Sequence, residues 1–366
     1  MNQEKLGYIE AISLITIVII NKVILILPQN IIATTGSSAW LNTLYVSIIA
    51  ILITWLITFL YKHFQGRNIF EISHFLGGNT LKITLQILYI IALFIVPIYV
   101  LKNTCESLKV IYFKSSPLIY ILLFFLISSL VANHFSLKVI AKTNTILMIL
   151  SFLGIAVILV SSSKYFSFDR LFPILGYGTK RTFVSGLESL FSFSGIGYIF
   201  LLSPLIDKTE KFKKISLVSI IISGIYLFFS VTCILLSFST KGGESFSLYL
   251  LSRNVEFGRF VQRVDAIFIL FWIISIILYI SFAIHFLIDI FKKLIKVTDS
   301  RYINYSVHLL ILAFLLIPCT LAQFNYWVEN LFKIFVFAVL YFLSILILIL
   351  ANIKFKLTKT RKDLNT

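Results

Sequence analysis

Residues 19–28 read IINKVILILP and place an asparagine, a lysine and a proline inside a long apolar run. A proline inside a helix removes a backbone donor and clashes with the preceding turn, so it interrupts the helix. A charged side chain within an apolar run is costly in a membrane and usually faces the interior of a helix bundle. The stretch therefore predicts an interrupted membrane helix that carries Asn21 and Lys22 at its break.

The composition of the whole chain indicates a membrane protein. Of its 366 residues, 59% are hydrophobic and 13% are charged, and the mean hydropathy is +1.00. Globular domains are about 45–50% apolar. The apolar runs are continuous rather than alternating, which predicts membrane-spanning helices instead of a barrel. The 32 Lys and Arg residues exceed the 15 Asp and Glu residues but are spread over many loops. This spread indicates contact with a lipid bilayer and its anionic headgroups, and no nucleic-acid binding.

The apolar runs predict an all-α polytopic membrane protein with ten transmembrane helices in a single domain, residues 1–366. We expect the helices at residues 8–33, 40–61, 83–104, 117–134, 139–161, 183–206, 215–238, 264–290, 304–321 and 328–350. The polar segment 239–263 is long enough to form an external amphipathic helix. The tail, residues 351–366, is short and basic and is expected to lie in the cytoplasm.

The distribution of basic residues predicts that both termini are cytoplasmic. With the N-terminus inside, 19 of the Lys and Arg residues lie in inner segments and 12 in outer segments, and Lys22 lies within a span. Lys and Arg favour the cytoplasmic side of a membrane. Glu188 and Asp265 then fall near the outer surface, where we expect ion pairs with the basic outer loops.

The ten helices divide into two halves of five, residues 8–161 and 183–350. Because five is odd, two copies of a five-helix unit must cross the membrane in opposite senses, which produces an inverted repeat. Transporters of this kind bind their ligand near the midplane, where helices are interrupted. The second half opens with residues 191–198, FSFSGIGY, which predict an interrupted sixth helix. Alternatively, the two glycines allow close helix packing.

The two interruptions predict a binding site for a small amino acid. Free N–H groups at the start of a half-helix carry a partial positive charge that suits a carboxylate. Lys22 would hold that carboxylate or replace a coupling cation, unless its ammonium group extends to the outer membrane surface. Asn21 would bond the ligand or an exposed backbone carbonyl.

Several short motifs, in order along nearly the whole chain, carry a family resemblance. They are residues 21–28, Ala39-Trp40, GRNIFEI at 66–72, LKVIAKTN at 137–144, LFPILGYG at 171–178, and VDAIF at 264–268 with Trp272. Together they resemble the permease-like B subunit of bacterial spore germinant receptors, within the amino acid–polyamine–organocation superfamily.

The resemblance implies a leucine-transporter-like fold with an amino-acid germinant bound between helices 1, 3, 6 and 8. It also implies partner A and C subunits and a location in the spore inner membrane. The ligand-binding residues implied by position in that fold are Asn21, Lys22, Val23, Ile24, Tyr99, Phe193, Ser194, Gly195, Gly197, Ser275 and Tyr279. Many relatives carry glycines in the first interruption, where this chain has Asn21 and Val23, so the ligand of a relative does not transfer.

Three functions are compatible with a helix bundle of this kind: a germinant-sensing subunit, a proton- or cation-coupled amino-acid symporter, and an intramembrane enzyme. An enzyme would need a histidine with a serine, aspartate or metal partner inside the bundle. The sequence has no HExxH or GxSxG motif, and Cys105, Cys233 and Cys319 have no metal-ligand spacing. We therefore expect no enzymatic activity, no metal and no cofactor.

Overall fold

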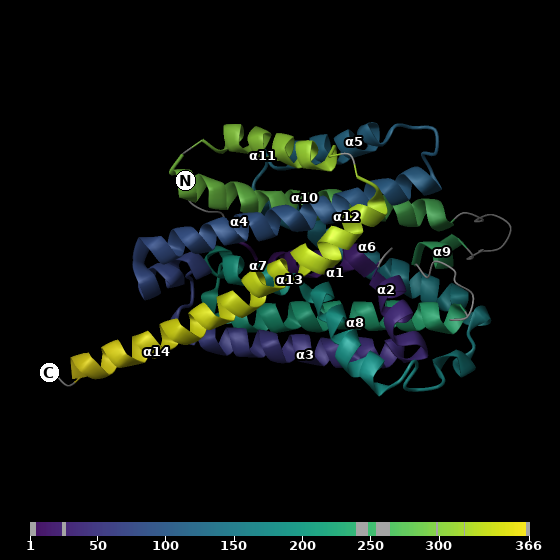
Figure 1. Cartoon of the computed structure of the whole chain (residues 1–366), viewed down its shortest axis with the longest axis horizontal. Helices are drawn as coiled ribbons and strands as arrows, with labels where there is room; N and C mark the ends of the chain where they lie inside the picture. The colour runs from purple at the N-terminus through teal and green to yellow at the C-terminus, as the bar shows by residue number, and fades with distance from the viewer. Residues whose placement is uncertain are drawn as a thin grey trace.

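The computed structural model describes residues 5–23, 27–238, 248–253, 264–297, 299–317 and 319–363. Within these ranges the regular structure is helical, and Leu6 and Ile206 form an isolated β-bridge. The long helices run along the longest axis of the molecule, and both termini lie at the same end (Figure 1).

The helices follow the predicted apolar runs. The first run contains α1 (Tyr8–Val23) and α2 (Leu27–Thr35). The next runs contain α3 (Ala39–Leu60), α4 (Ile69–Ile111), α5 (Leu118–Ala132) and α6 (Leu137–Ser162). In the second half, α8 (Phe212–Ser237), α10 (Val264–Ile295) and α11 (Ser300–Leu315) are regular helices. Short helices connect them: η1 (Gly36–Ser38), η2 (Tyr61–His63), η3 (Ser163–Tyr165), η4 (Phe168–Leu171), η8 (Thr209–Lys211) and α9 (Leu248–Arg253).

Two segments of the second half are irregular. The sixth segment consists of a π-helical turn η5 (Lys180–Val184), the 3₁₀ helix η6 (Ser185–Phe193), α7 (Ile196–Leu202) and the short η7 (Ser203–Leu205). The tenth segment consists of α12 (Leu321–Trp327), η9 (Val328–Phe332), α13 (Lys333–Phe337), η10 (Ala338–Leu343) and α14 (Ser344–Asp363), of which η9 and η10 are π-helical.

Seven helical segments of the described residues are long and apolar enough to cross a membrane. They are Leu27–His63, Ile69–Ile111, Leu137–Tyr165, Lys180–Leu205, Thr209–Ser237, Ile269–Ile295 and Leu321–Thr358. The predicted polytopic α-helical membrane protein is thus confirmed. The count of ten spans and the inverted repeat stay predictions, and the predicted helix at 239–263 falls largely outside the described residues.

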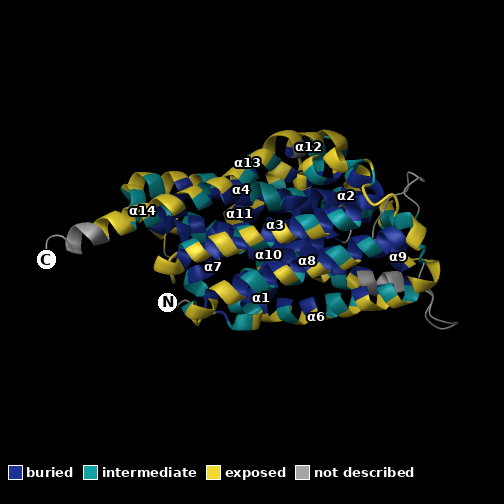
Figure 2. Ribbon diagram, turned by 90° about the horizontal axis from the view of Figure 1, so that it is seen from below, coloured by how far each residue is buried: buried dark blue, intermediate teal, exposed yellow. Residues whose placement is uncertain are grey.

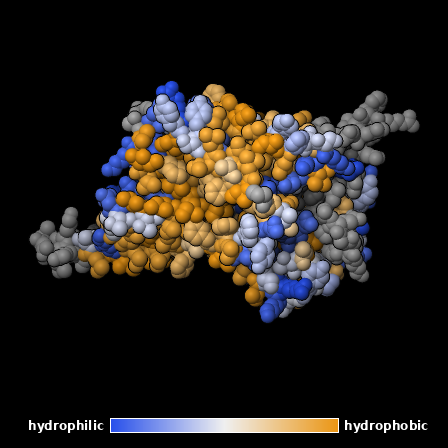
Figure 3. Space-filling model, turned by 45° about the horizontal axis from the view of Figure 1, so that its top comes forward, coloured by the Kyte–Doolittle hydropathy of each residue, from blue (hydrophilic) through white to orange (hydrophobic). Residues whose placement is uncertain are grey.

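The surface of the bundle matches a lipid environment. Figure 3 shows a broad hydrophobic region across the middle of the face in view, with hydrophilic side chains gathered toward the two ends. On α3, Ile48, Leu52, Trp55 and Phe59 lie on one helical face and are each 48–59% exposed. An apolar face of this extent is unfavourable in water and favourable against lipid tails.

The first helix forms the centre of the bundle. In α1, 12 of 16 residues are buried, and the helix packs against α6, α8 and α10. The burial view shows the exposed residues along the outer helices and continuous burial inside (Figure 2). Because α1 has protein on nearly every side, a polar side chain on it faces other helices rather than lipid.

The sixth segment is irregular where the sequence predicts an interruption. Ser194 and Gly195 form a turn between η6 and α7. A Cβ atom on Gly195 would lie 3.0 Å from the Ile15 carbonyl oxygen of α1, and one on Gly197 would lie 2.9 Å from the Leu340 side chain. The glycines therefore also allow the close packing that was the alternative interpretation. In the first helix, α1 ends at Val23 and α2 begins at Leu27.

Candidate functional site

A cavity of about 360 Å³ lies among α1, α2, α4, η6, α10 and the η9–α13 part of the tenth segment. Small-molecule sites in proteins have volumes of about 300–1,000 Å³, mostly with apolar walls and a few polar groups. Apolar residues of α4 and α13, including Ile95, Val96 and Val336, form part of the wall here. The cavity is large enough for a small amino acid and offers polar groups from several helices.

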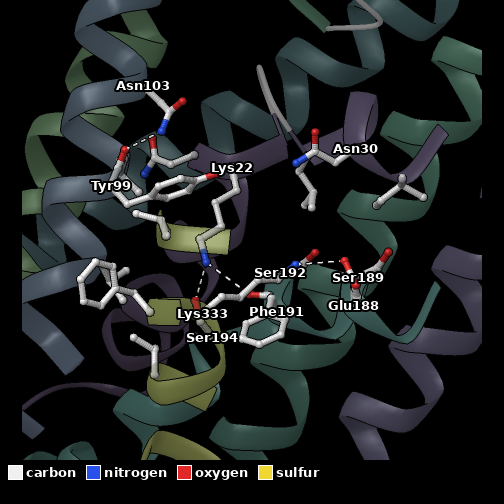
Figure 4. Close-up of a pocket in the computed structure, with 18 of the residues that line it drawn as sticks. Lys22, Asn30, Tyr99, Asn103, Glu188, Ser189, Phe191, Ser192, Ser194 and Lys333 are labelled. Carbon is white, nitrogen blue, oxygen red and sulfur yellow. Dashed lines mark hydrogen bonds and ion pairs between the residues drawn. The ribbon is translucent and has the colours of Figure 1, made fainter. Parts of the chain in front are cut away.

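Lys22 joins the end of α1 to the irregular part of the sixth segment. Its ammonium group donates to the Phe191 carbonyl oxygen at 3.3 Å and to the Ser194 hydroxyl oxygen. Figure 4 shows the side chain extending through the cavity toward these two residues. The ammonium group thus lies inside the bundle, in contact with the sixth segment.

Asn21 lines the same cavity. Its side-chain amide makes hydrogen bonds to neighbouring residues of the bundle. Its amide nitrogen donates to the carbonyl oxygens of Ile17 and Ser275, at 3.0 and 3.1 Å. The Ser275 hydroxyl donates to the Asn21 side-chain oxygen at 2.6 Å. Asn21 and Ser275 therefore tie α1 to α10 beneath the cavity wall.

The structure brings four of the predicted ligand-binding residues to the cavity: Asn21, Lys22, Tyr99 and Ser194. Tyr99 reaches it from α4 and stacks on Phe324, with ring centroids 6.4 Å apart. The other predicted residues with described placement are buried and lie outside the cavity lining: Val23, Phe193, Gly195, Gly197, Ser275 and Tyr279. Ile24 lies outside the described residues. Contact of any of them with a ligand stays a prediction.

Five residues of the sixth segment line the cavity: Glu188, Ser189, Phe191, Ser192 and Ser194. Their spacing repeats every three residues because η6 is a 3₁₀ helix, which has three residues per turn. In an α-helix, which has 3.6 residues per turn, Ser189 and Ser192 would point away from the face that carries Ser194. A prediction that treats this stretch as an α-helix therefore omits them from the site. The serines at 189, 192 and 194 were the signal in the sequence that could have identified this face.

The tenth segment also lines the cavity, which the sequence reasoning missed. Val328, Phe332, Lys333 and Val336 face it. Asn30 and Thr34 of α2 and Asn103 and Thr104 of α4 are further polar lining residues that were not predicted. We find no pattern in the apolar run of the tenth segment that distinguishes its cavity-facing residues from its lipid-facing ones.

Two polar bridges hold the cavity walls together. The Lys333 ammonium group lies 3.3 Å from the Glu188 carboxylate and 4.8 Å from the centre of the Phe191 ring. Glu188 thus has an ion-pair partner, but that partner belongs to the cavity lining, so the expected pairing with basic outer loops stays a prediction. The side chain of Asp265 lies outside the described residues. On the α4 side, Asn103 and Asn325 donate to each other's side-chain oxygens at 3.0 and 3.1 Å.

The charges of the cavity do not balance. The described lining side chains include two ammonium groups, Lys22 and Lys333, and one carboxylate, Glu188, which pairs with Lys333. The described residues contain no group of three or more His, Cys, Asp or Glu side chains that could hold a metal ion. The cavity therefore combines a lysine that has no carboxylate partner among the described residues with neutral hydroxyl and amide groups.

Apolar helices arranged around a cavity with a few polar groups define a polytopic membrane protein with room for a small molecule. The chain belongs to the spore germination protein family, whose sequence profile matches residues 5–326. This finding confirms the resemblance found in the sequence motifs. The family is of the receptor or transporter type and is not known as an enzyme family.

The chain is similar to two proteins of Bacillus species. The chain is 25% identical over 236 residues to spore germination protein B2 of Bacillus subtilis (strain 168), covering 64% of this chain and 63% of that protein. It is 21% identical over 322 residues to spore germination protein XB of Bacillus anthracis, covering 86% of this chain and 88% of that protein. The match to the first relative thus spans slightly less than two thirds of its length.

Proposed function

We propose that this protein is the permease-like B subunit of a spore germinant receptor and that it binds a small amino acid in the cavity. The observation that carries the proposal is the composition of the cavity wall, to which α1, α4, η6 and α10 all contribute. These elements correspond to helices 1, 3, 6 and 8, the ones between which the family resemblance implies a germinant. Membership of the spore germination protein family supports the same role.

The proposed receptor has ten membrane-spanning helices in two inverted halves, with both termini in the cytoplasm and the chain in the spore inner membrane. It works without catalysis. A ligand that binds one of two conformations more tightly shifts the population toward that conformation. The shifted conformation then presents a different surface to partner A and C subunits, which receive the signal.

The alternative is a proton- or cation-coupled amino-acid symporter. One observation favours it: the Lys22 ammonium group contacts a backbone carbonyl and a hydroxyl beside the turn of the sixth segment. Oxygens of this kind coordinate the coupling cation in transporters with interrupted helices. A protonated lysine at such oxygens occupies the position of a cation, so the observation favours coupling to a proton over coupling to a second cation bound there.

Binding and uptake by the purified chain in proteoliposomes separate the two functions. For the receptor we expect saturable binding of a radiolabelled amino acid, with no accumulation under an inward sodium or proton gradient. Gradient-driven accumulation would establish the symporter and contradict the pure receptor. If none of the standard amino acids binds, the proposed ligand class is wrong.

A further inference from the structure

Lys22 differs from the other lysines inside the bundle because it has no carboxylate partner among the described residues. Lys333 pairs with Glu188 at 3.3 Å, and Lys102, which is 5% exposed, lies 3.8 Å from the Glu106 carboxylate. Lys22 instead contacts the neutral oxygens of Phe191 and Ser194. A cation held away from water without an opposite charge is costly.

The hydrogen bonds of Lys22 leave one donor free. An ammonium group has three N–H donors and no acceptor. The Phe191 carbonyl and the Ser194 hydroxyl accept two of them, and the described residues supply no third acceptor. The side chain lines the cavity, so the remaining donor is available to a molecule bound there (Figure 4).

We propose that Lys22 binds the carboxylate of the ligand and that the free carboxylate is what selects the ligand class. This inference rests on the proposed amino-acid site. A carboxylate supplies both what Lys22 lacks, the opposite charge, and an acceptor for its third donor. Hydrogen bonds between two charged groups are about twice as strong as neutral ones.

The remaining lining narrows the ligand class further. Ile95, Val96 and Val100 of α4 are apolar and line the same cavity. Glu188, the one described carboxylate of the lining, already pairs with Lys333. These groups fit an amino acid with one free carboxylate, whose side chain would meet apolar residues of α4 and neutral polar groups such as Asn103 and Thr104.

A comparison of each acid with its amide tests this role. The probes are radiolabelled L-alanine, L-valine, L-leucine and L-isoleucine, with the matching amino-acid amides as competitors, and the full chain is in proteoliposomes. We expect the wild type to prefer acid over amide by about tenfold to a hundredfold, because a hydrogen bond to a charged group contributes this much. In Lys22→Met the acid should lose this advantage, so that acid and amide compete equally.

Two variants act as controls. Lys22→Arg keeps the positive charge and should keep the preference for the acid, while Leu187→Ala changes an exposed side chain outside the cavity lining and should leave the binding of acid and amide unchanged. A Lys22→Met protein that elutes as a monodisperse peak and still prefers the acid as strongly as the wild type overturns the role of Lys22 alone. If none of the four probes binds to the wild type, these apolar amino acids are excluded and the other standard amino acids are tested in the same way. If none of those binds either, the amino-acid ligand itself is wrong and this inference falls with it.

Discussion

Asn21 and Lys22 are neighbours on α1 with different tasks. Asn21 bonds to α10 through the backbone and hydroxyl of Ser275, whereas Lys22 points into the cavity and toward the sixth segment. Consecutive helical residues point in directions about 100° apart, because a helix has 3.6 residues per turn. Asn21 therefore contributes to helix packing, and Lys22 contributes to the cavity.

The first prediction concerns the packing role of Asn21. Asn21→Ala removes the hydrogen bonds to α10, each worth about 0.5–1.5 kcal/mol. We expect unfolding of the purified chain in detergent at a clearly lower temperature than the wild type, measured by thermal melting. Asn30→Ala is the control, because Asn30 lines the cavity but is exposed on α2. Equal melting of Asn21→Ala and the wild type would contradict the structural role of Asn21.

At the scale of single residues, the sequence predicted the cavity position of a charged side chain better than that of a small polar one. Lys22 was identified because charge is rare in an apolar run, and it does line the cavity. Ser192 was missed because its orientation depends on the 3₁₀ geometry of η6. That geometry arises from tertiary packing and leaves only a weak three-residue pattern in the sequence.

Among the elements, the tenth segment differs most from a regular helix. Its two π-helical turns, η9 and η10, lie on either side of α13, which carries Lys333 and Val336 to the cavity. π-helical turns inside α-helices occur frequently at functional sites. Asn325 on α12 connects this segment to Asn103 on α4.

The second prediction is that this amide pair couples α4 to the tenth segment. Hydrogen bonds between membrane helices contribute about 0.6 kcal/mol on average. In a double-mutant cycle of Asn103→Ala, Asn325→Ala and the double variant, we expect a coupling free energy of about 0.5–1 kcal/mol, measured by unfolding in mixed micelles. Strictly additive single effects would show that the pair does not hold the two elements together.

The existence of the helices was readable from sequence, but their internal geometry was not. Asn68 and Glu71 in the GRNIFEI motif form the capping box that begins α4, at 2.9 and 3.2 Å. The same helix bends at Gly77 and Gly78, where Gly78 has φ of 70°. In contrast, the π-helical turns of the tenth segment, VENLF and AVLYFL, contain no proline, glycine or capping motif that would mark their geometry in the sequence.

At the scale of the whole molecule, both ends of the chain lie at one end of the bundle (Figure 1). On the face in view in Figure 3, a hydrophobic region separates that end from the opposite one. With the proposed cytoplasmic termini, the opposite end, including residues 166–179, faces the outer side of the membrane. Hydropathy alone predicted this region, because every lipid-facing stretch must be apolar.

The third prediction tests this orientation. Cysteines placed at Thr179 and Thr358, both exposed, are labelled with a membrane-impermeant maleimide after Cys105, Cys233 and Cys319 are replaced by serine. We expect Thr179→Cys to react in intact cells and Thr358→Cys to react only after permeabilisation. The reverse pattern would place the C-terminus outside the membrane, and labelling of both in intact cells would contradict the five spans predicted between the two positions.

The central claim is that the cavity binds the amino acid, and filling the cavity tests it most directly. Ser192→Trp adds a large side chain to the cavity lining, while Leu187→Trp adds the same side chain to the same 3₁₀ helix at an exposed position outside the lining. We would measure equilibrium binding of the radiolabelled amino acid by both variants in proteoliposomes, after confirming monodisperse elution. The account predicts that Ser192→Trp loses saturable binding and that Leu187→Trp binds like the wild type. Unchanged affinity in a well-folded Ser192→Trp protein would place the binding site elsewhere.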